Sequence, residues 1–132
     1  MSEKTRKVLV HWSEETTHER IADLLCCGFE GGVNYWCQIV GFKEPDKVER
    51  QAYPDRLYKH LDYPMNPGGQ VIIKACDEKT RRVLDLAAID RGLQVMANKY
   101  PRHFANWLAE NDDAETGDVF IQCCVLGEVV YG

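Results

Sequence analysis

The sequence predicts an α+β fold, in which a small, mostly antiparallel sheet is covered by three or four helices within a single domain. Three observations lead to this expectation. The length of 132 residues suits one domain that covers residues 1–132. Short runs rich in β-forming residues are bounded by turn residues, and longer segments carry apolar residues three or four positions apart.

The N-terminal part is expected to form a strand and then a helix. Residues 5–12 are rich in β-forming side chains, which predicts the first strand. Thr16 and Glu19 have the spacing of a capping box, so a helix of about three turns should follow. An apolar stripe runs along this helix, and Gly28 is expected to end it.

The next segments give weaker signals. Residues 29–32 read as a break, and residues 33–42 favour a strand, with a helical turn around Tyr35 as the alternative. Residues 43–69 are polar and contain four of the five prolines. Such a length is unusual for a loop without structure, so we expect a short helix near Asp55–His60.

A β-hairpin is predicted downstream of this segment. Residues 66–69, Asn-Pro-Gly-Gly, are a strong turn signal. Residues 70–76 and 81–84 are β-rich runs that residues 77–80 connect. The two runs should pair as antiparallel strands.

Helices are predicted for the C-terminal part. Asp85 should cap a helix that runs to about Lys99, and Pro101 suits the first turn of the next helix. The final element begins near Asp113, where acidic residues favour a helix start, and a strand over residues 119–125 is the alternative. The apolar sides of the two earlier helices contain Leu86, Ile89, Leu93 and Met96 in the first, and Phe104, Trp107 and Leu108 in the second.

Charge is unevenly distributed along the chain. The 16 basic and 21 acidic side chains give a net charge of −5, and residues 108–132 contain six acids and no base. Because a nucleic-acid binder needs a basic stripe, we expect no long nucleic acid as a partner. No apolar run approaches the about 18–20 residues of a membrane span, and the N-terminus lacks the pattern of a secretory signal, so we expect no membrane contact.

The six cysteines favour a reduced interior. They occur as two adjacent pairs and two single residues: Cys26–Cys27, Cys37, Cys76 and Cys123–Cys124. No Cys-x-x-Cys or Cys/His spacing indicates a metal site. The pairs lie among apolar residues, where reduced cysteine acts as a small hydrophobe, so we expect buried thiols in a reducing cytoplasm.

No motif for catalysis is present. The chain lacks a dinucleotide-binding glycine pattern, a phosphate loop and a nucleophile elbow. None of the four histidines has a partner at metal-ligand spacing. We therefore favour a binding protein over an enzyme, and predict no catalytic residue, metal or cofactor.

The segment from residue 29 to residue 36 is the candidate binding site. Two glycines would expose main-chain N–H groups to an anion, and the two following aromatic rings would stack on a base. The alternative interpretation is a Gly-Gly turn followed by two core aromatic residues. The candidate ligand-binding residues here are Glu30, Gly31, Gly32, Asn34, Tyr35 and Trp36.

Several of these residues belong to a wider resemblance. The segment Ile21-Ala22-Asp23-Leu24-Leu25, then Phe29-Glu30-Gly31-Gly32-x-x-Tyr35-Trp36, Gly68-Gly69, and the ending DAETGDVFIQCC at residues 113–124 with GEVVYG at residues 127–132 resemble a family of small proteins encoded by tailed phages and prophages. The similarity covers most of the chain except its first residues and residues 43–60. It implies a small accessory protein in a bacterial cytoplasm, a setting in which many such proteins blunt host defence.

These observations predict a non-enzymatic, phage-type accessory protein that counters host defence by sequestering a small nucleotide signal, such as a cyclic nucleotide. The two glycines would hold phosphate, and Gln122 would help Glu30 and Asn34 to read polar edges. Arg81, Arg82 or Arg91 would supply positive charge.

Two alternatives stay open. The first is a protein-directed inhibitor of a host defence complex, and the second is a small hydrolase or lyase that acts on nucleotide signals. The inhibitor would use the acidic C-terminal surface formed by Asp112, Asp113, Glu115 and Asp118. A domain of 132 residues has little room for a pocket inside its own core, so we also expect a homo-oligomer.

Overall fold

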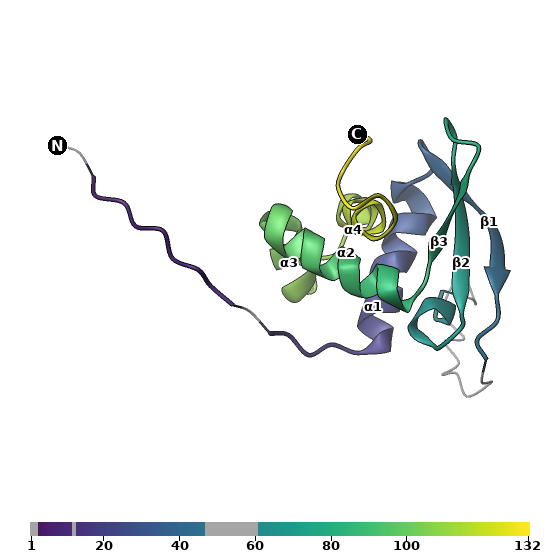
Figure 1. The fold of residues 1–132 in the computed structure, drawn as a ribbon, viewed down its shortest axis with the longest axis horizontal. Coiled ribbons are helices and arrows are strands. Elements are labelled where there is room, and N and C mark those ends of the chain that lie inside the picture. Colours follow the sequence, from purple (N-terminus) through teal and green to yellow (C-terminus); the bar gives the residue numbers. More distant parts are fainter. Residues whose placement is uncertain (1–2, 12, 47–60) are drawn as a thin grey trace.

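Three antiparallel strands form the sheet, in the order β1-β2-β3, which confirms the predicted α+β class (Figure 1). The computed structural model describes residues 3–11, 13–46 and 61–132. The strands are β1 (Cys37–Lys43), β2 (Gln70–Ala75) and β3 (Arg81–Leu84). Within the described chain, β2 is central, and β1 and β3 form the two edges of the sheet.

Helices cover one side of the sheet (Figure 1). The described chain forms α1 (His18–Cys27), α2 (Leu86–Lys99), α3 (Pro101–Leu108) and α4 (Ala114–Leu126), together with a π-helical turn η1 (Gly28–Gly32) and a 3-10 turn η2 (Tyr63–Met65). Helix α4 packs against α1, η1 and α2, so it is the centre of the helical layer.

The predicted hairpin is present. β2 pairs with β3 in antiparallel register, with Val71 opposite Leu84. Along β2 the side chains alternate, so that Val71, Ile73 and Ala75 are buried while their neighbours are half-buried. This period of two directs one face of the sheet at the helices. The turn signal before β2 is also confirmed, since Gly69 N donates to Asn66 O at 3.0 Å.

Residues 119–125, for which helix and strand were the two alternatives, belong to helix α4, as the preferred prediction has it. Asp113 caps it by accepting a hydrogen bond from Thr116 N at 2.8 Å. Gly127 ends it with a φ of 78°, in the left-handed region that favours glycine. Residues 116–124 are all buried. Over these residues the helix has no solvent-exposed face, and this stretch of sequence therefore reads almost like a buried strand.

The predicted helices α2 and α3 are present, but two of their leucines are not in the core. Asp85 accepts from Ala88 N and caps α2, as expected. Leu86 is 42 % exposed, however, and Leu108 on α3 is 38 % exposed, so the predicted apolar side of each helix is buried only in part. The reason on α2 is Gly92, where a Cβ would overlap Cys124 of α4. This close approach turns the buried face of α2 toward Gly92 and away from Leu86.

The expected first strand does not form. Residues 3–11, which we call the arm, have no secondary structure and extend away from the body (Figure 1). The prediction rested on β-forming side chains, but these stabilise a strand only when a neighbouring strand pairs with it. Within the described residues, the arm has no such neighbour. Trp12, the last residue of the predicted strand, lies outside the described residues.

Helix α1 begins one residue later than predicted. The Thr17 side chain, not that of Thr16, accepts from the main chain of Arg20 and caps the helix. Position 19 is therefore one residue too early to complete a capping box. Gly28 does not end the helical path either, since its φ of −69° is right-handed and the chain continues into η1. The expected break at residues 29–32 is thus a wider, π-helical continuation of α1.

A turn over residues 34–36 separates η1 from β1, so the predicted strand over residues 33–42 starts later, at Cys37. The alternative, a helical turn around Tyr35, describes the first part of that segment, where Trp36 N and Cys37 N both donate to Val33 O. The short helix expected near Asp55–His60 lies outside the described residues. Within the residues that the structure describes, no helix is long and apolar enough to cross a membrane.

Candidate functional site

Helix α4 holds the candidate segment against the body. η1 closes through a hydrogen bond from Val33 N to Gly28 O at 3.0 Å. The following turn then brings Tyr35 and Trp36 to the same carboxylate, that of Asp118 on α4. Tyr35 Oη donates to Asp118 Oδ2 at 2.6 Å, and Trp36 Nε1 donates to Oδ1 at 2.8 Å. More than 80 positions of sequence separate the donors from this acceptor.

Gln122 lies one turn further along α4 and forms hydrogen bonds with the C-terminal segment of the chain. Its Oε1 accepts the N–H groups of Val130 at 2.8 Å and Tyr131 at 2.9 Å. Its Nε2 donates to Asp118 Oδ1 at 2.9 Å and to Tyr131 O at 3.1 Å. Gln122 is fully buried, and these bonds satisfy its amide within the protein.

The ring of Tyr131 covers Trp36. The ring centroids are 4.9 Å apart and the planes differ by 10°, which is a stacked arrangement. Tyr131 Oη donates to Asp77 Oδ1 in the β2–β3 turn at 2.6 Å, and this hydrogen bond raises the pKa of Tyr131 to about 12. Trp36 is 1 % exposed as a result.

This geometry corrects two of the predicted ligand contacts. In this conformation Trp36 has no free face for a base, and Gln122 has no free edge for a ligand. The alternative interpretation, in which the aromatic residue belongs to the core, describes Trp36. It does not describe Tyr35, whose side chain is 54 % exposed although its hydroxyl is bound to Asp118.

The two glycines differ in their surroundings. A Cβ at Gly32 would overlap the carbonyl oxygen of Ala114, so the backbone there faces α4 and not a ligand. A Cβ at Gly31 would have no atom within 4 Å, and Gly31 is exposed. Asn34 and Glu30 are also exposed, and Glu30 Oε1 accepts from Cys26 Sγ at 3.1 Å. The exposed part of this segment therefore includes the negatively charged side chain of Glu30.

The arginines that were expected to neutralise a phosphate have other partners or positions. Arg82 donates to Glu78 at 2.8 Å and to Val125 O at 3.0 Å, and the first of these bonds lowers the pKa of Glu78. Arg91 donates to Cys124 O at 2.7 Å. Arg81 is exposed on β3, opposite Lys74 of β2.

The predicted acidic surface is smaller than expected. Asp118 is buried, so its assignment to a protein-binding surface was wrong. Asp112 accepts from Arg20 Nη1 at 3.2 Å and its side chain is 7 % exposed. Asp113 caps α4, and hydrogen bonds from Thr116 lower its pKa. Of the predicted four, Glu115 is left as an open carboxylate, with a side chain 79 % exposed.

The buried thiols Cys37 and Cys123 lack the properties of nucleophiles. All six cysteines are thiols outside any disulfide, and Cys26, Cys37, Cys123 and Cys124 are buried. The prediction of buried doublets is therefore confirmed for Cys123–Cys124 and for Cys26, while Cys27 is half-buried. Burial raises the pKa of Cys37 and of Cys123 to about 12. Because the thiolate is the reactive form, these groups are inert at neutral pH. Among the described residues, no group of three or more His, Cys, Asp or Glu side chains could hold a metal ion.

A groove that the sequence analysis missed lies between α2, α3 and the residues that lead from the arm into α1. Its volume is about 830 Å³. The residues that line it are Val10, His11, Ser13, Glu14, Thr16, Leu93, Gln94, Ala97, Asn98, Pro101, Phe104, Ala105, Trp107 and Leu108. Leu93, Phe104 and Leu108 had been predicted to lie on the apolar sides of their helices. Their helical spacing was a real signal, but it does not distinguish a core face from a groove wall.

No known protein family, curated protein or solved structure that we compared matches this chain.

Proposed function

We propose that this chain is a non-enzymatic accessory protein that acts by binding another polypeptide, and that the arm is its binding element. The observation that carries this proposal is the exposure of three consecutive aliphatic residues in the arm. Val8 is 63 % exposed, Leu9 82 % and Val10 74 %. Exposed apolar runs of this kind mark interaction sites in soluble proteins.

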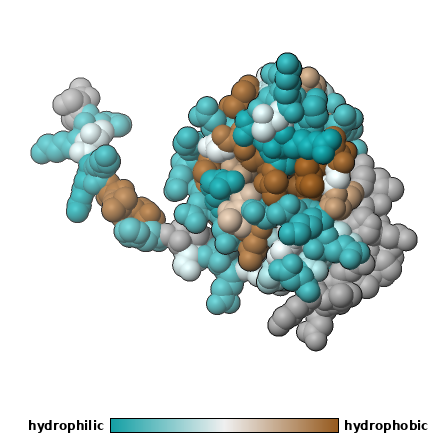
Figure 2. All heavy atoms as spheres, turned by 45° about the vertical axis from the view of Figure 1, so that its right-hand side comes forward, coloured by the Kyte–Doolittle hydropathy of each residue, from teal (hydrophilic) through white to brown (hydrophobic). Residues whose placement is uncertain are grey.

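The chemistry of the arm supports a polypeptide as its partner. An extended segment offers N–H and C=O groups for strand addition, and alternate side chains then contact the partner. Figure 2 shows the arm apart from the body, with a hydrophobic stretch between hydrophilic ones. Lys4, Arg6 and Lys7 precede the aliphatic run, so the arm joins positive charge to apolar surface.

The setting that we propose comes from the resemblance to small phage-encoded proteins. In that setting the chain acts in a bacterial cytoplasm and counters host defence by contact with a protein of a defence complex. This is the protein-directed alternative of the sequence analysis, with the arm in place of most of the acidic surface. Of that surface, Glu115, with a side chain 79 % exposed, is available to a basic partner, and the neighbouring Glu110, which was not predicted, is 75 % exposed.

Sequestration of a nucleotide stays a prediction that the closed Trp36 makes less favourable. The same holds for a hydrolase or lyase activity on nucleotides. Titration calorimetry with cyclic di- and oligonucleotides tests the first, and chromatography of the incubated nucleotide tests the second. We expect no saturable heat and no altered product, and either signal would contradict a protein-directed role.

The arm can be tested by co-purification. A tagged full-length chain is mixed with bacterial lysate that also contains an untagged copy, and retained polypeptides are identified by mass spectrometry. The variants are Leu9→Lys in the arm and Val83→Lys, a matched change at an exposed aliphatic residue of β3. We expect wild type and Val83→Lys to retain the same polypeptides and Leu9→Lys to lose them. If Leu9→Lys retains what wild type retains, or if nothing is retained above bare resin, the proposal fails.

A further inference from the structure

The groove has the surface of a receptor for an extended, basic and apolar segment. Its walls on α2 and α3 are largely apolar, with Leu93, Ala97, Phe104 and Leu108 among them. Among the described residues that line it there is no Lys or Arg, and the one carboxylate is that of Glu14. A segment that carries both aliphatic and positively charged side chains therefore matches the groove better than an acidic one.

A second observation in the groove points to an incoming acceptor. Trp107 lines the groove and is 3 % exposed, and its Nε1 has no hydrogen-bond partner among the described residues. A buried donor without an acceptor costs about 1–3 kcal/mol. The main-chain carbonyl groups of an extended segment are acceptors of the kind that this indole N–H lacks.

The outer wall of the groove is itself extended chain. Val10, His11 and Ser13 line it, and this part of the chain has no secondary structure. A strand that enters the groove would thus lie on the apolar side chains of α2 and α3 and beside the main chain of Val10, His11 and Ser13. Antiparallel pairing would join N–H and C=O groups of the two segments.

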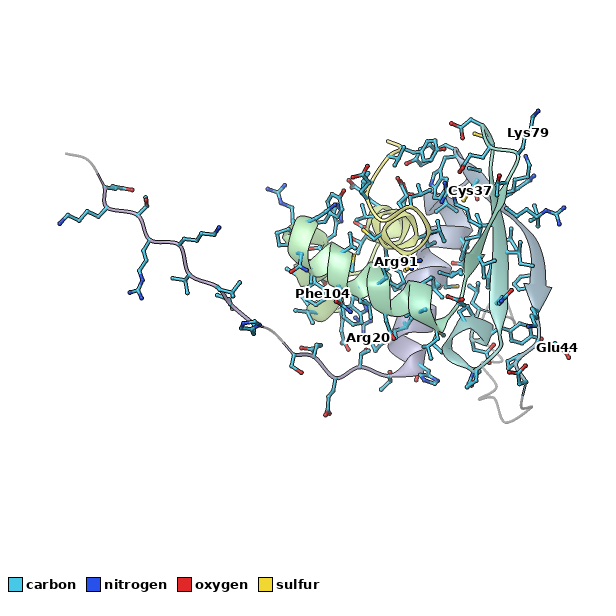
Figure 3. The ribbon with its side chains drawn as sticks, in the orientation of Figure 1. Arg20, Cys37, Glu44, Lys79, Arg91 and Phe104 are labelled. Atoms are coloured by element: carbon cyan, nitrogen blue, oxygen red, sulfur yellow. The ribbon has the colours of Figure 1, made fainter. Side chains whose placement is uncertain are left out.

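The arm has the composition that the groove requires, but it does not fill the groove of its own chain. Residues 3–11 carry a net charge of +2, which leaves −7 for the remainder. Val10 and His11 of the arm lie at the edge of the groove. The rest of the arm, toward the N-terminus, extends away from the body, and no side chain of the body is drawn beside it (Figure 3). Figure 3 also shows Phe104 on the side of the helices from which the arm departs.

We infer that two copies of this chain exchange arms. Residues 4–9 of one copy occupy the groove of the second, antiparallel to residues 10–11 and 13–16 of that copy, and the exchange is reciprocal. A twofold axis then relates the two arms, as in most homodimers. Residues 5–11, the described part of the predicted first strand, form a strand only in this dimer. This inference rests on the proposed role of the arm as a binding element, and it adds a second copy of the chain to the polypeptides that the arm binds.

Sedimentation equilibrium of the full chain tests the exchange. We expect wild type to have twice the monomer mass of 15.1 kDa. Leu9→Lys removes the arm contact, and Leu108→Lys places a charge in the groove. Leu86→Lys is the matched control, because Leu86 is an exposed leucine of α2 that does not line the groove. The first two variants should weaken dimerisation at least tenfold, and the control should leave it unchanged.

Mixing the two disrupted variants distinguishes exchange from other modes of association. Leu9→Lys has an intact groove, and Leu108→Lys has an intact arm, so the mixture can form one arm–groove contact. We expect the mixture to associate more strongly than either variant alone and more weakly than wild type. A mixture that behaves as the average of its components would overturn the exchange.

The outcomes separate this inference from the proposed function. A wild-type chain that stays monomeric at every concentration overturns the exchange, whether the arm is then free or folded into its own groove. If Leu9-dependent capture of a lysate protein persists in that case, the proposed function stands. Dimerisation that depends on Leu9 but not on Leu108 overturns the groove as the receptor and leaves the arm as the binding element.

Discussion

At the scale of single residues, Asp118 determines how the candidate segment is closed. Its carboxylate accepts hydrogen bonds from Tyr35, Trp36 and Gln122, and it is 7 % exposed. A buried carboxylate is stable only when its lone pairs are satisfied, and these three donors do so. Gln122 then extends the network to the C-terminal segment. A single side chain thus joins three stretches of the chain that are distant in sequence.

Replacement of this carboxylate should be costly. In Asp118→Ala the Trp36 indole and the Gln122 amide lose an acceptor in the interior, so we expect a loss of about 3 kcal/mol in the free energy of unfolding. Urea denaturation measures this loss. Glu115→Ala, at an exposed position of the same helix, is the control and should change stability by less than about 0.5 kcal/mol. Equal effects of the two changes would contradict the network.

The same network predicts a dependence of stability on alkaline pH. Burial of its hydroxyl and the hydrogen bond to Asp118 raise the pKa of Tyr35 from 10.0 to about 12. Because the folded pKa lies above the unfolded one, the stabilisation is complete below pH 10 and is lost as the pH rises toward 12. The free energy of unfolding of Tyr35→Phe should therefore fall less steeply than that of wild type over this interval. Identical slopes in urea denaturation series would show that Tyr35 is not coupled to Asp118.

At the scale of elements, the fold depends on a glycine contact between two helical segments. A Cβ at Gly28 would lie 2.9 Å from the carbonyl oxygen of Gly117, and a Cβ at Gly117 would overlap main-chain atoms of Gly28. The start of η1 and helix α4 therefore touch through their backbones. This contact explains why the chain continues in a π-helical turn at Gly28, where an end of the helix was expected.

A pair of matched substitutions tests this contact. Gly117→Ala forces two backbones apart, and we expect it to lower the free energy of unfolding by about 1–3 kcal/mol. Gly31→Ala places the same methyl group in open space and should change stability little. Thermal and urea unfolding of the two variants provide the comparison. If Gly31→Ala were the more damaging change, Gly31 would have a role that its open surroundings do not indicate.

At the scale of the whole molecule, the arm and the body have opposite charge. The arm carries +2, the remaining chain −7, and the side chains of Lys4, Arg6 and Lys7 are exposed. Attraction between exposed charges is screened by salt, with a Debye length that falls from about 10 Å at 0.1 M to about 3 Å at 1 M. The exchanged dimer should consequently be weaker at the higher sodium chloride concentration.

The salt dependence has its own control. Lys7→Gln removes one charge from the arm and leaves the aliphatic run unchanged, so its dimer should respond less to salt than that of wild type. Sedimentation at several salt concentrations measures both. A dimer that is insensitive to salt in wild type would show that apolar contacts alone hold the arm.

The sequence by itself determined the elements whose signals are local. Asp85 and Asp113 cap α2 and α4 through bonds that span three residues, and the β2–β3 hairpin is closed by a short turn. Such interactions depend on neighbouring residues, so their sequence patterns are sufficient. Thr17 caps α1 in place of the predicted Thr16, because two adjacent threonines offer nearly the same local cap.

Only the tertiary structure decided which of the residues predicted as ligand or partner contacts are accessible. Asp118 was predicted as surface and Trp36 as a ligand contact, yet one is the buried acceptor of the other across 82 positions of sequence. The arm has a strand sequence and no strand to pair with, and Leu108 has core spacing but lies in a groove. Accessibility is set by what packs against a residue from distant parts of the chain, and no periodicity in a single sequence contains that information.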